Sequence, residues 1–383
     1  MRAASLRAAI VTEAQHLGFD LVGVSAPEPP LHGEVFESWL GAGRHGEMAY
    51  LATERARRLR ADPRQVLPGC RSILVLGVSY PAPQNPPLYN ETPRLFGQVA
   101  AYAVGDDYHD VLRERLEQLA GFIERHLGES ILHRGYTDTG PILERDLAQR
   151  AGLGWIGKNT CLLHPGAGSY WLLAELFLGV DLEPDPPFTA DHCGECRRCI
   201  EACPTGCILP DRTLDSRRCI SYLTIELKGA IPSSLRPLLG KWVFGCDVCQ
   251  QACPWNQRFA RPQTTPIFAA RAGLPFPDLI EVLSLSQEEF SRRFRGSPLK
   301  RARRAGFLRN VAVALGNWRD TSALTALASS LRHEPEALVR SHVAWAIGRI
   351  GGQEAAHILA LAARNETDLT VLGEIHQALA ALG

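Results

Sequence analysis

Seven cysteines stand in two related runs and carry the clearest chemistry in the sequence. The first run reads Cys193-x2-Cys196-x2-Cys199-x3-Cys203-Pro204, and the second reads Cys246-x2-Cys249-x3-Cys253-Pro254. The first run has the spacing of bacterial ferredoxins, whose thiolates bind 4Fe-4S clusters. In such a run the first three cysteines bind one cluster and the fourth binds the other. The spacing therefore predicts two 4Fe-4S clusters that exchange ligands between the runs.

The second run lacks the first cysteine of a complete ferredoxin motif. By pseudo-symmetry Cys253 is predicted to complete the first cluster, and Cys219 supplies the ligand that the second cluster lacks. The two expected ligand sets are Cys193, Cys196, Cys199 and Cys253 for one cluster, and Cys203, Cys219, Cys246 and Cys249 for the other. A pair of structural zinc sites is the alternative, because paired C-x2-C motifs also bind zinc. The ferredoxin run and its echo favour iron and sulfide.

Composition limits the remaining possibilities. Lysine plus arginine equals aspartate plus glutamate at 41 each, so no global charge directs the chain to nucleic acid or membrane. The N-terminus has helical apolar spacing rather than a secretion signal, and no apolar run approaches the roughly 20 residues that cross a bilayer. We expect a cytosolic protein with reduced thiols. Cys70, Cys161 and Cys207 are then predicted to be small buried residues.

The elements around these cysteines suggest three domains. Residues 1–185 are predicted to form an α/β domain, with helices near 5–17, 107–126 and 141–151. Apolar segments at 72–80 and 169–178 are typical of buried strands, whereas the proline-rich stretch 81–93 indicates a loop. The cluster domain is expected at 186–262, entered through a proline-containing linker at 182–188.

The chain becomes rich in alanine, leucine and arginine from about residue 285. The segments 308–317 and 339–349 resemble each other, with Arg309 and Arg340 separated by 31 positions (340 − 309), and a degraded third copy is expected at 372–379. Small apolar helices at this period predict an all-α, HEAT-like repeat over 285–383. Stacked helical pairs of this kind usually present a binding face.

A group of seven cations opens the repeat without an intervening acid. It comprises Arg292, Arg293, Arg295, Lys300, Arg301, Arg303 and Arg304. A solvated helix face is one interpretation of such a group. Against the neutral background of the chain, we favour a phosphate-binding patch.

Further motifs resemble the epoxyqueuosine reductase family, which completes queuosine synthesis on tRNA. The similarity covers most of the chain and includes the cysteine pattern, Cys219 to Thr224 and the terminal repeat. The other motifs are Met48 to Leu51, Arg60 to Arg64, Tyr102-Ala103-x-Gly105-x-Asp107-Tyr108-His109, Asp138-Thr139-Gly140-Pro141-x2-Glu144-Arg145 and Ala151 to Asn159.

This resemblance implies a cobalamin between the N-terminal domain and the cluster domain. It also implies that the N-terminal fold is flavin-reductase-like and that the cobalt lacks a lower histidine ligand. The general acid of the family falls on Asp138, whose pocket should be apolar in order to raise its pKa. Cofactor or substrate contacts are implied at Arg60, Tyr102, Asp138, Lys158, Asn159, Ser221 and Asp247. Helix caps, turns and core packing are the ordinary structural alternatives for these residues.

The implied substrate is a tRNA anticodon stem-loop with epoxyqueuosine in the wobble position. Electrons should pass from an unidentified donor through the clusters to cobalamin, in a protein that acts as a monomer. The expected phosphate contacts are Lys228, Lys300, Arg301, Arg303, Arg304, Arg309 and Arg340.

Two other kinds of protein use similar parts. A reductive dehalogenase also combines cobalamin with two 4Fe-4S clusters, but it normally has a twin-arginine export signal and needs no basic repeat. A ferredoxin-type electron carrier or tRNA-binding adaptor needs no α/β domain of nearly 190 residues before its clusters. The visible absorption of a bound corrin would distinguish the enzyme from the carrier.

Overall fold

The computed structural model describes residues 2–82, 94–260 and 268–382. It contains two compact units, each assembled from separate stretches of the chain. The first unit comprises residues 1–82, 107–216 and 248–268, and the second comprises 83–106, 217–247 and 269–383. The three-domain division drawn from the sequence stays a prediction, because each unit takes in part of the segment expected to hold the clusters. Most of the predicted loop at 81–93 lies outside the described residues.

The first unit is built on a four-stranded antiparallel sheet in the order β1-β2-β7-β4. The strands are β1 (Leu21–Ser25), β2 (Ser72–Ser79), β4 (His133–Tyr136) and β7 (Trp171–Leu178). The two apolar segments predicted as buried strands are β2 and β7, and they pair along their whole length from Ser72–Leu178 to Ser79–Trp171. Both strands are central, which explains why their sequences are almost continuously apolar.

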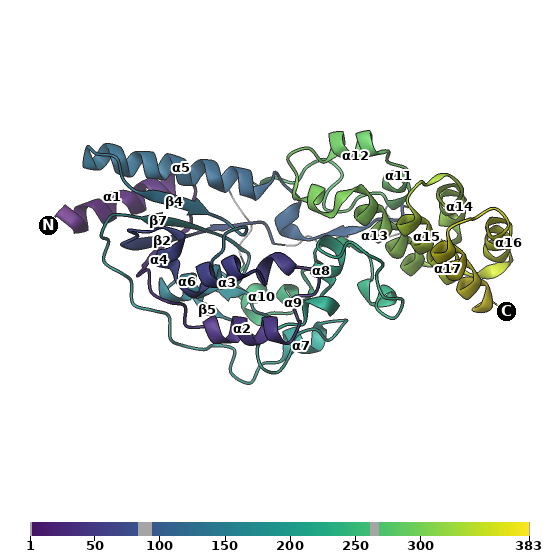
Figure 1. Ribbon diagram of the computed structural model, residues 1–383, viewed down its shortest axis with the longest axis horizontal. Helices are drawn as coiled ribbons and strands as arrows, with labels where there is room; N and C mark the ends of the chain where they lie inside the picture. Colours follow the sequence, from purple (N-terminus) through teal and green to yellow (C-terminus); the bar gives the residue numbers. More distant parts are fainter. Residues whose placement is uncertain (1, 83–93, 261–267, 383) are drawn as a thin grey trace. The chain divides into compact units, whose positions relative to one another are not determined.

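Helices cover both faces of this sheet (Figure 1). One face carries α1 (Arg2–His16) and α5 (Tyr108–Leu127), and the other carries α6 (Glu144–Arg150). The predicted helix at 107–126 is confirmed, and its buried face contains Leu112, Leu116, Leu119 and Ile123. The helix predicted at 141–151 begins only at Glu144, so Pro141 precedes it.

Shorter elements complete the first unit. They are α2 (Gly33–Gly41), α3 (Glu54–Ala61), α4 (Pro63–Val66), β5 (Trp155–Ile156), β6 (Leu162–Leu163), α7 (Arg198–Ala202), α9 (Val248–Gln251) and α10 (Pro254–Phe259), with a 3-10 turn at Ala49–Leu51. The helices α7 and α9 contact each other, and each lies within one of the two cysteine runs.

The second unit is mainly helical, as the sequence predicts for its C-terminal part. Its helices are α8 (Ile220–Ile225), α11 (Leu279–Leu283), α12 (Gln287–Arg293), α13 (Arg303–Trp318), α14 (Leu324–His333), α15 (Ala337–Ile350), α16 (Gly352–Ala363) and α17 (Leu369–Ala380). A two-stranded parallel pair joins β3 (Gln98–Val99) to β8 (Trp242–Phe244). Turns of 3-10 helix lie at Ala101–Ala103, Arg236–Leu239, Pro298–Ala302 and Thr321–Ala323.

Helices α13, α15 and α17 pack in succession and form the inner layer of the repeat. Small residues permit their close approach. A Cβ atom on Gly316 would lie 2.9 Å from the Ala346 Cα atom, and one on Gly348 would lie 2.6 Å from the Ala378 Cβ atom. Gly316 and Gly348, which occur near the ends of the two similar segments, therefore mark the points where neighbouring helices cross. This close approach explains why the glycine recurs in the repeat.

No helix in the described parts of the chain has the length and apolarity needed to cross a membrane.

Candidate active site and cluster ligands

Asp138 lies on the loop that joins β4 to α6. Its φ angle is +56°, within the left-handed region that L residues seldom adopt, although aspartate tolerates it better than most. The Glu144 carboxylate accepts a hydrogen bond from the Asp138 backbone N–H and stabilises this conformation. Unusual backbone geometry of this kind is concentrated at functional sites.

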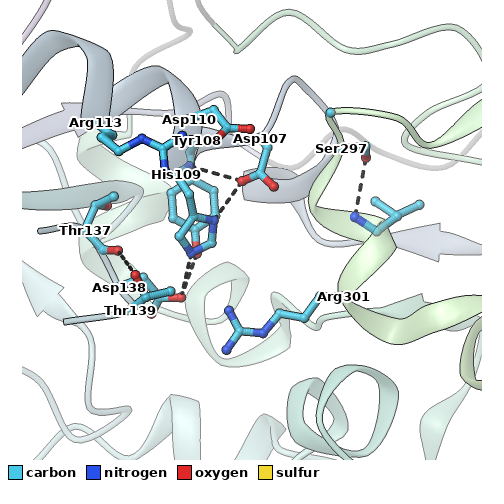
Figure 2. Close-up of polar contacts among 12 residues, drawn as sticks. Asp107, Tyr108, His109, Asp110, Arg113, Thr137, Asp138, Thr139, Ser297 and Arg301 are labelled. Carbon is cyan, nitrogen blue, oxygen red and sulfur yellow. Dashed lines mark hydrogen bonds and ion pairs between the residues drawn. The ribbon is translucent and has the colours of Figure 1, made fainter. Parts of the chain in front are cut away.

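Three side chains form a hydrogen-bonded chain with Asp138 (Figure 2). The Tyr108 hydroxyl donates to Asp138 Oδ2 at 2.9 Å, and His109 Nε2 lies 3.2 Å from the same oxygen. On its other side His109 Nδ1 lies 2.7 Å from Asp107 Oδ1. Asp107 also caps α5, because its carboxylate accepts a hydrogen bond from the His109 backbone N–H. The start of α5 therefore aims an imidazole at the Asp138 loop.

The charge of His109 follows from its two carboxylate partners. Burial alone lowers the pKa of this imidazole, but the hydrogen bonds and charges of Asp107 and Asp138 outweigh it and raise the pKa to about 9. The structure differs from the apolar pocket expected around Asp138, whose side chain is 48% exposed and accepts hydrogen bonds from polar neighbours. The protonated group at neutral pH is therefore the histidine.

Two further carboxyl groups lie near Asp138, the half-buried Glu144 and the fully buried Glu175. Glu175 lies on β7 between Val75 and Tyr136 and is fully buried. Burial and the nearby Glu144 carboxyl raise the pKa of Glu175 well above its ordinary value. Burial, followed by the charge of Asp138, raises the pKa of Glu144 to about 7. No donor among the described residues reaches either oxygen of Glu175, but the Glu144 carboxyl lies within hydrogen-bonding reach, so a proton shared between the two groups stabilises the pair.

The first unit brings together the four thiols of the first predicted ligand set. Burial raises the pKa of the Cys199 thiol, and the neighbouring Cys193, Cys253 and Cys196 raise it further. The Trp155 indole N–H points at Cys193 Sγ over 3.4 Å, and Trp155 packs against Cys253 in a small apolar core. Cys253 therefore lies near thiols of the other run, and the assembly of these four cysteines around a cluster stays a prediction.

The second set is divided between the units, with Cys203 and Cys249 in the first and Cys219 and Cys246 in the second. Its assembly around a cluster stays a prediction. Within the first unit, Cys203 Sγ lies 3.4 Å from Cys207 Sγ. This contact and the Thr205 hydroxyl outweigh burial and lower the pKa of Cys203 to about 4. Sequence reasoning treated Cys207 only as a buried filler, yet it stabilises the thiolate form of a predicted ligand.

Two of the expected cofactor contacts hold the backbone of the first unit. Lys158 Nζ donates to the carbonyls of Gly194 and Cys196 at 2.5 and 3.0 Å, which fixes the loop that begins the first cysteine run. Arg60 donates to the Gly140 carbonyl at 3.2 Å, and burial lowers its pKa. Arg60 therefore supports the loop that carries Asp138.

Two other expected contacts have buried polar atoms without partners among the described residues. They are Nδ2 of Asn159 in the first unit and Oδ1 of Asp247 in the second. The other oxygen of Asp247 accepts from the Ala101 N–H at 2.8 Å, while burial raises the pKa of this carboxyl to about 7. Orphaned donors and acceptors of this kind fit a polar cofactor. Tyr102 packs beside Phe244, and Ser221 lies in the first turn of α8.

The basic residues of the second unit divide into surface and structural groups. Lys228, Lys300, Arg301 and Arg303 are exposed, and we call them the basic patch. Burial lowers the pKa of Lys228, and the nearby charges of Arg303 and Arg301 lower it further, which shows that these cations are neighbours. Arg301 also donates to Glu226 at 2.8 Å.

Three expected phosphate contacts are instead occupied within the fold. Arg304 pairs with Glu334 at 2.6 Å and Arg340 pairs with Glu366 at 2.7 Å, with both pairs largely buried. Arg309 is completely buried and donates to the carbonyls of Leu223, Leu227 and Gly229. The prediction that Arg309 contacts phosphate is therefore wrong, because its guanidinium is shielded from any external ligand.

Comparison with known proteins identifies the family of this chain. A model for epoxyqueuosine reductase QueG matches residues 60–139. Epoxyqueuosine reductase from Pseudomonas aeruginosa is 45% identical over 349 residues, which cover 91% of this chain and 95% of that protein. The chain belongs to the epoxyqueuosine reductase family. The epoxyqueuosine reductase of Escherichia coli is 43% identical over 87% of this chain and 86% of its own length.

Other family models and solved structures agree with this membership. A 4Fe-4S double cluster binding domain matches residues 192–256, and HEAT repeats match residues 299–380. A crystal structure of epoxyqueuosine reductase with an epoxyqueuosine-modified tRNA-Tyr stem loop is 31% identical, covers 99% of both chains and has a TM-score of 0.91. An epoxyqueuosine reductase from Bacillus subtilis, solved with its catalytic aspartate loop swung out of the active site, is 30% identical with a TM-score of 0.89. The chain thus matches a double-cluster domain followed by HEAT repeats.

Sequence reasoning missed the functional surroundings of Asp138. The sequence motifs contain Tyr108, His109 and Glu144, but the sequence alone assigned no role to these residues. Glu175 had a usable signal, because a lone acid inside the apolar segment 169–178 must be neutralised or paired when it is buried.

Proposed function

We propose that this chain reduces epoxyqueuosine to queuosine at the wobble position of tRNA. The observation that carries the proposal is the family membership across nine-tenths of the chain, which includes the double-cluster domain, the repeat and the Asp138 loop. Reduction of an epoxide to an alkene consumes two electrons and two protons and releases water. The function therefore requires a source of single electrons, a centre that activates the epoxide and a proton donor.

Two 4Fe-4S clusters supply the electrons in this proposal. The gathered thiols of Cys193, Cys196, Cys199 and Cys253 support the first ligand set. For the second we propose Cys203, Cys219, Cys246 and Cys249. Such clusters pass single electrons at low potential, and the donor that reduces them is a separate low-potential carrier. The reduced thiols that they need are available in the cytosol, where we place the protein as a monomer.

The centre that activates the epoxide is proposed to be cobalamin, held by a flavin-reductase-like N-terminal domain. When bound, cobalamin supplies a reducible cobalt that can act on carbon or oxygen. The orphaned atoms of Asn159 and Asp247 support a polar cofactor, and Tyr102 and Ser221 are further candidates for contacts with it. We assign Lys158 and Arg60 supporting roles, because both hold loops that carry proposed functional residues.

Asp138 is the proposed proton donor to the departing oxygen. Its support is the strained loop, the half-exposed carboxyl and the hydrogen bonds that orient it. The wobble base of an anticodon loop unstacks easily, so the modified base can enter a protein pocket. The basic patch is the proposed contact for the flanking phosphates, since its cations are exposed and adjacent.

The decisive assay uses the reconstituted full-length protein and a tRNA stem-loop that contains epoxyqueuosine. We expect queuosine to form under anaerobic conditions with a low-potential one-electron reductant, and only when cobalamin is present. Nucleoside mass spectrometry detects the loss of one oxygen atom. Protein that carries its full iron, sulfide and corrin but yields no queuosine would refute the proposed function. Turnover at the full rate without cobalamin would refute only the assignment of that cofactor.

A further inference from the structure

The proposed reaction needs two protons, and this requirement rests on the proposed function. One epoxide C–O bond breaks and its oxygen takes the first proton. The second C–O bond then breaks, and the hydroxyl takes the second proton and leaves as water. Two electrons from the low-potential donor form the carbon–carbon double bond. A single carboxyl group passes on only one proton at a time, so Asp138 must be reprotonated within each turnover.

A second acid lies in direct contact with Asp138. His109 Nε2 is 3.2 Å from Asp138 Oδ2, and its Nδ1 is 2.7 Å from Asp107 Oδ1. The imidazole ring also stacks on the Tyr108 ring, with 4.0 Å between the ring centroids. Figure 2 shows the ring suspended between the two carboxylates. Both ring nitrogens face acceptors, which is the arrangement that an imidazolium requires.

We propose that His109 is the proton store of this site and recharges Asp138 through their shared hydrogen bond. The proton on Nε2 moves to Asp138 Oδ2 and from there to the substrate oxygen, while Asp107 keeps the proton on Nδ1. The neutral imidazole then takes a new proton from solvent, to which its side chain is 22% exposed. His109 acts through Asp138 and has no need to touch the substrate.

The charged groups around His109 support this role. Burial opposes protonation, but Asp107 and Asp138 raise the pKa of His109 to about 9, so the store is filled at neutral pH. Asp110 lies next to His109 on α5, but Arg113 pairs with it at 2.6 Å and neutralises its charge. Tyr108 donates to Asp138 and adds no charge. The two carboxylates that contact the ring therefore determine its protonation.

The pH dependence of turnover provides the test. We would compare wild type with His109→Gln and Asp107→Asn between pH 6 and 10, in the epoxyqueuosine assay with saturating stem-loop. His126→Gln is the matched control, because His126 is exposed in the last turn of the same helix. Asparagine caps helices as well as aspartate does, so Asp107→Asn removes the charge and keeps α5 capped. Iron content and thermal unfolding show whether each variant is folded.

Wild type and the control should lose activity as pH rises through about 9. His109→Gln should be slower at pH 7.5 by about 100-fold, since proton transfer by a positioned group contributes about 10²–10⁴-fold. Its pH profile should also lack the loss of activity near pH 9, which we call the alkaline limb. Asp107→Asn should keep the limb but move it toward the ordinary histidine pKa of about 6.5. A wild-type rate and profile in folded His109→Gln, or an unmoved limb in Asp107→Asn, would overturn the proposal. Wild type without any queuosine production would instead overturn the proposed function.

Discussion

Replacement of Arg309 by methionine tests whether the repeat supports the segment that carries two predicted cluster ligands. Arg309 lies on α13 and donates to the carbonyls of Leu223, Leu227 and Gly229 at 2.6, 2.9 and 2.6 Å. Asn310 beside it donates to the carbonyls of Thr224 and Val243. These carbonyls belong to the chain between Cys219 and Cys246. Methionine fills a similar space but donates no hydrogen bond, so the buried carbonyl of Leu223 and the partly buried carbonyls of Leu227 and Gly229 lose this partner.

The expected cost is about 3 kcal/mol of unfolding free energy, because an orphaned buried group costs about 1–3 kcal/mol and the two partly buried carbonyls, which water can reach, add less. For a unit of this size, that corresponds to a fall of about 10 °C in Tm. The loosened segment should also fail to hold the second cluster. Iron should therefore fall from about eight to about four atoms per chain, with the first cluster retained.

Arg340→Met is the matched control, because Arg340 occupies the equivalent position one repeat later. It pairs with Glu366, which keeps hydrogen bonds from the backbone N–H groups of Thr367 and Asp368 when the arginine is removed. Calorimetry and iron analysis of the reconstituted proteins provide the measurements. The control should retain its full iron and lose less stability. If Arg309→Met kept both its iron and its Tm, the reasoning that links this arginine to the cluster segment would fail.

Three further predictions concern the other features. Asp138→Asn should keep its iron and fold, since asparagine tolerates the left-handed backbone, but lose about 10²–10⁴-fold in turnover as judged by queuosine formation; a normal rate would exclude Asp138 as proton donor. Glutamine at Lys300 and Arg303 should lower the slope of log affinity against log salt for stem-loop binding by about 0.7–0.9 per lost phosphate contact, and an unchanged slope would remove the basic patch from the interface. Burial raises the pKa of Glu144 to about 7 and that of Glu175 well above its ordinary value, so the folded state binds more protons than the unfolded state. The unfolding free energy should therefore fall as pH rises from about 4.5 to 7. Denaturant titrations of Glu175→Gln should show a flatter fall. An equally steep fall in that variant would contradict the assignment of the pH dependence to this carboxyl pair.

The predictable part of this molecule is the part that depends on local pattern. The apolar strands β2 and β7, the helix α5 and the repeating helices α13 and α15 each have a period or an apolar run that the sequence displays directly. The cysteine spacing likewise predicted a double-cluster domain, which a family model matches at residues 192–256, whereas the exchange of ligands between the runs stays a prediction.

Features that depend on contacts distant in sequence were not accessible in this way. The sequence alone cannot distinguish Arg309 from Arg303, because both are arginines near the start of the repeat. In the structure Arg309 is buried among backbone carbonyls, whereas Arg303 is exposed to solvent. The role of His109 required the pairing of α5 with a loop 29 residues away. The sequence predicted an apolar pocket that would keep Asp138 protonated. The structure instead places the half-exposed Asp138 carboxyl beside the Tyr108 hydroxyl and the His109 imidazole.

The interleaving of the two units has a consequence for biosynthesis. All segments of the first unit have been synthesised once residue 268 is made, whereas the second unit waits for the C-terminal helices. Cys219 and Cys246 lie on a segment whose carbonyls are held by α13, so this segment lacks its support while the nascent chain is still growing. Insertion of the second cluster should thus be a late, post-translational event, and a chain that stops before α13 should mature with one cluster only.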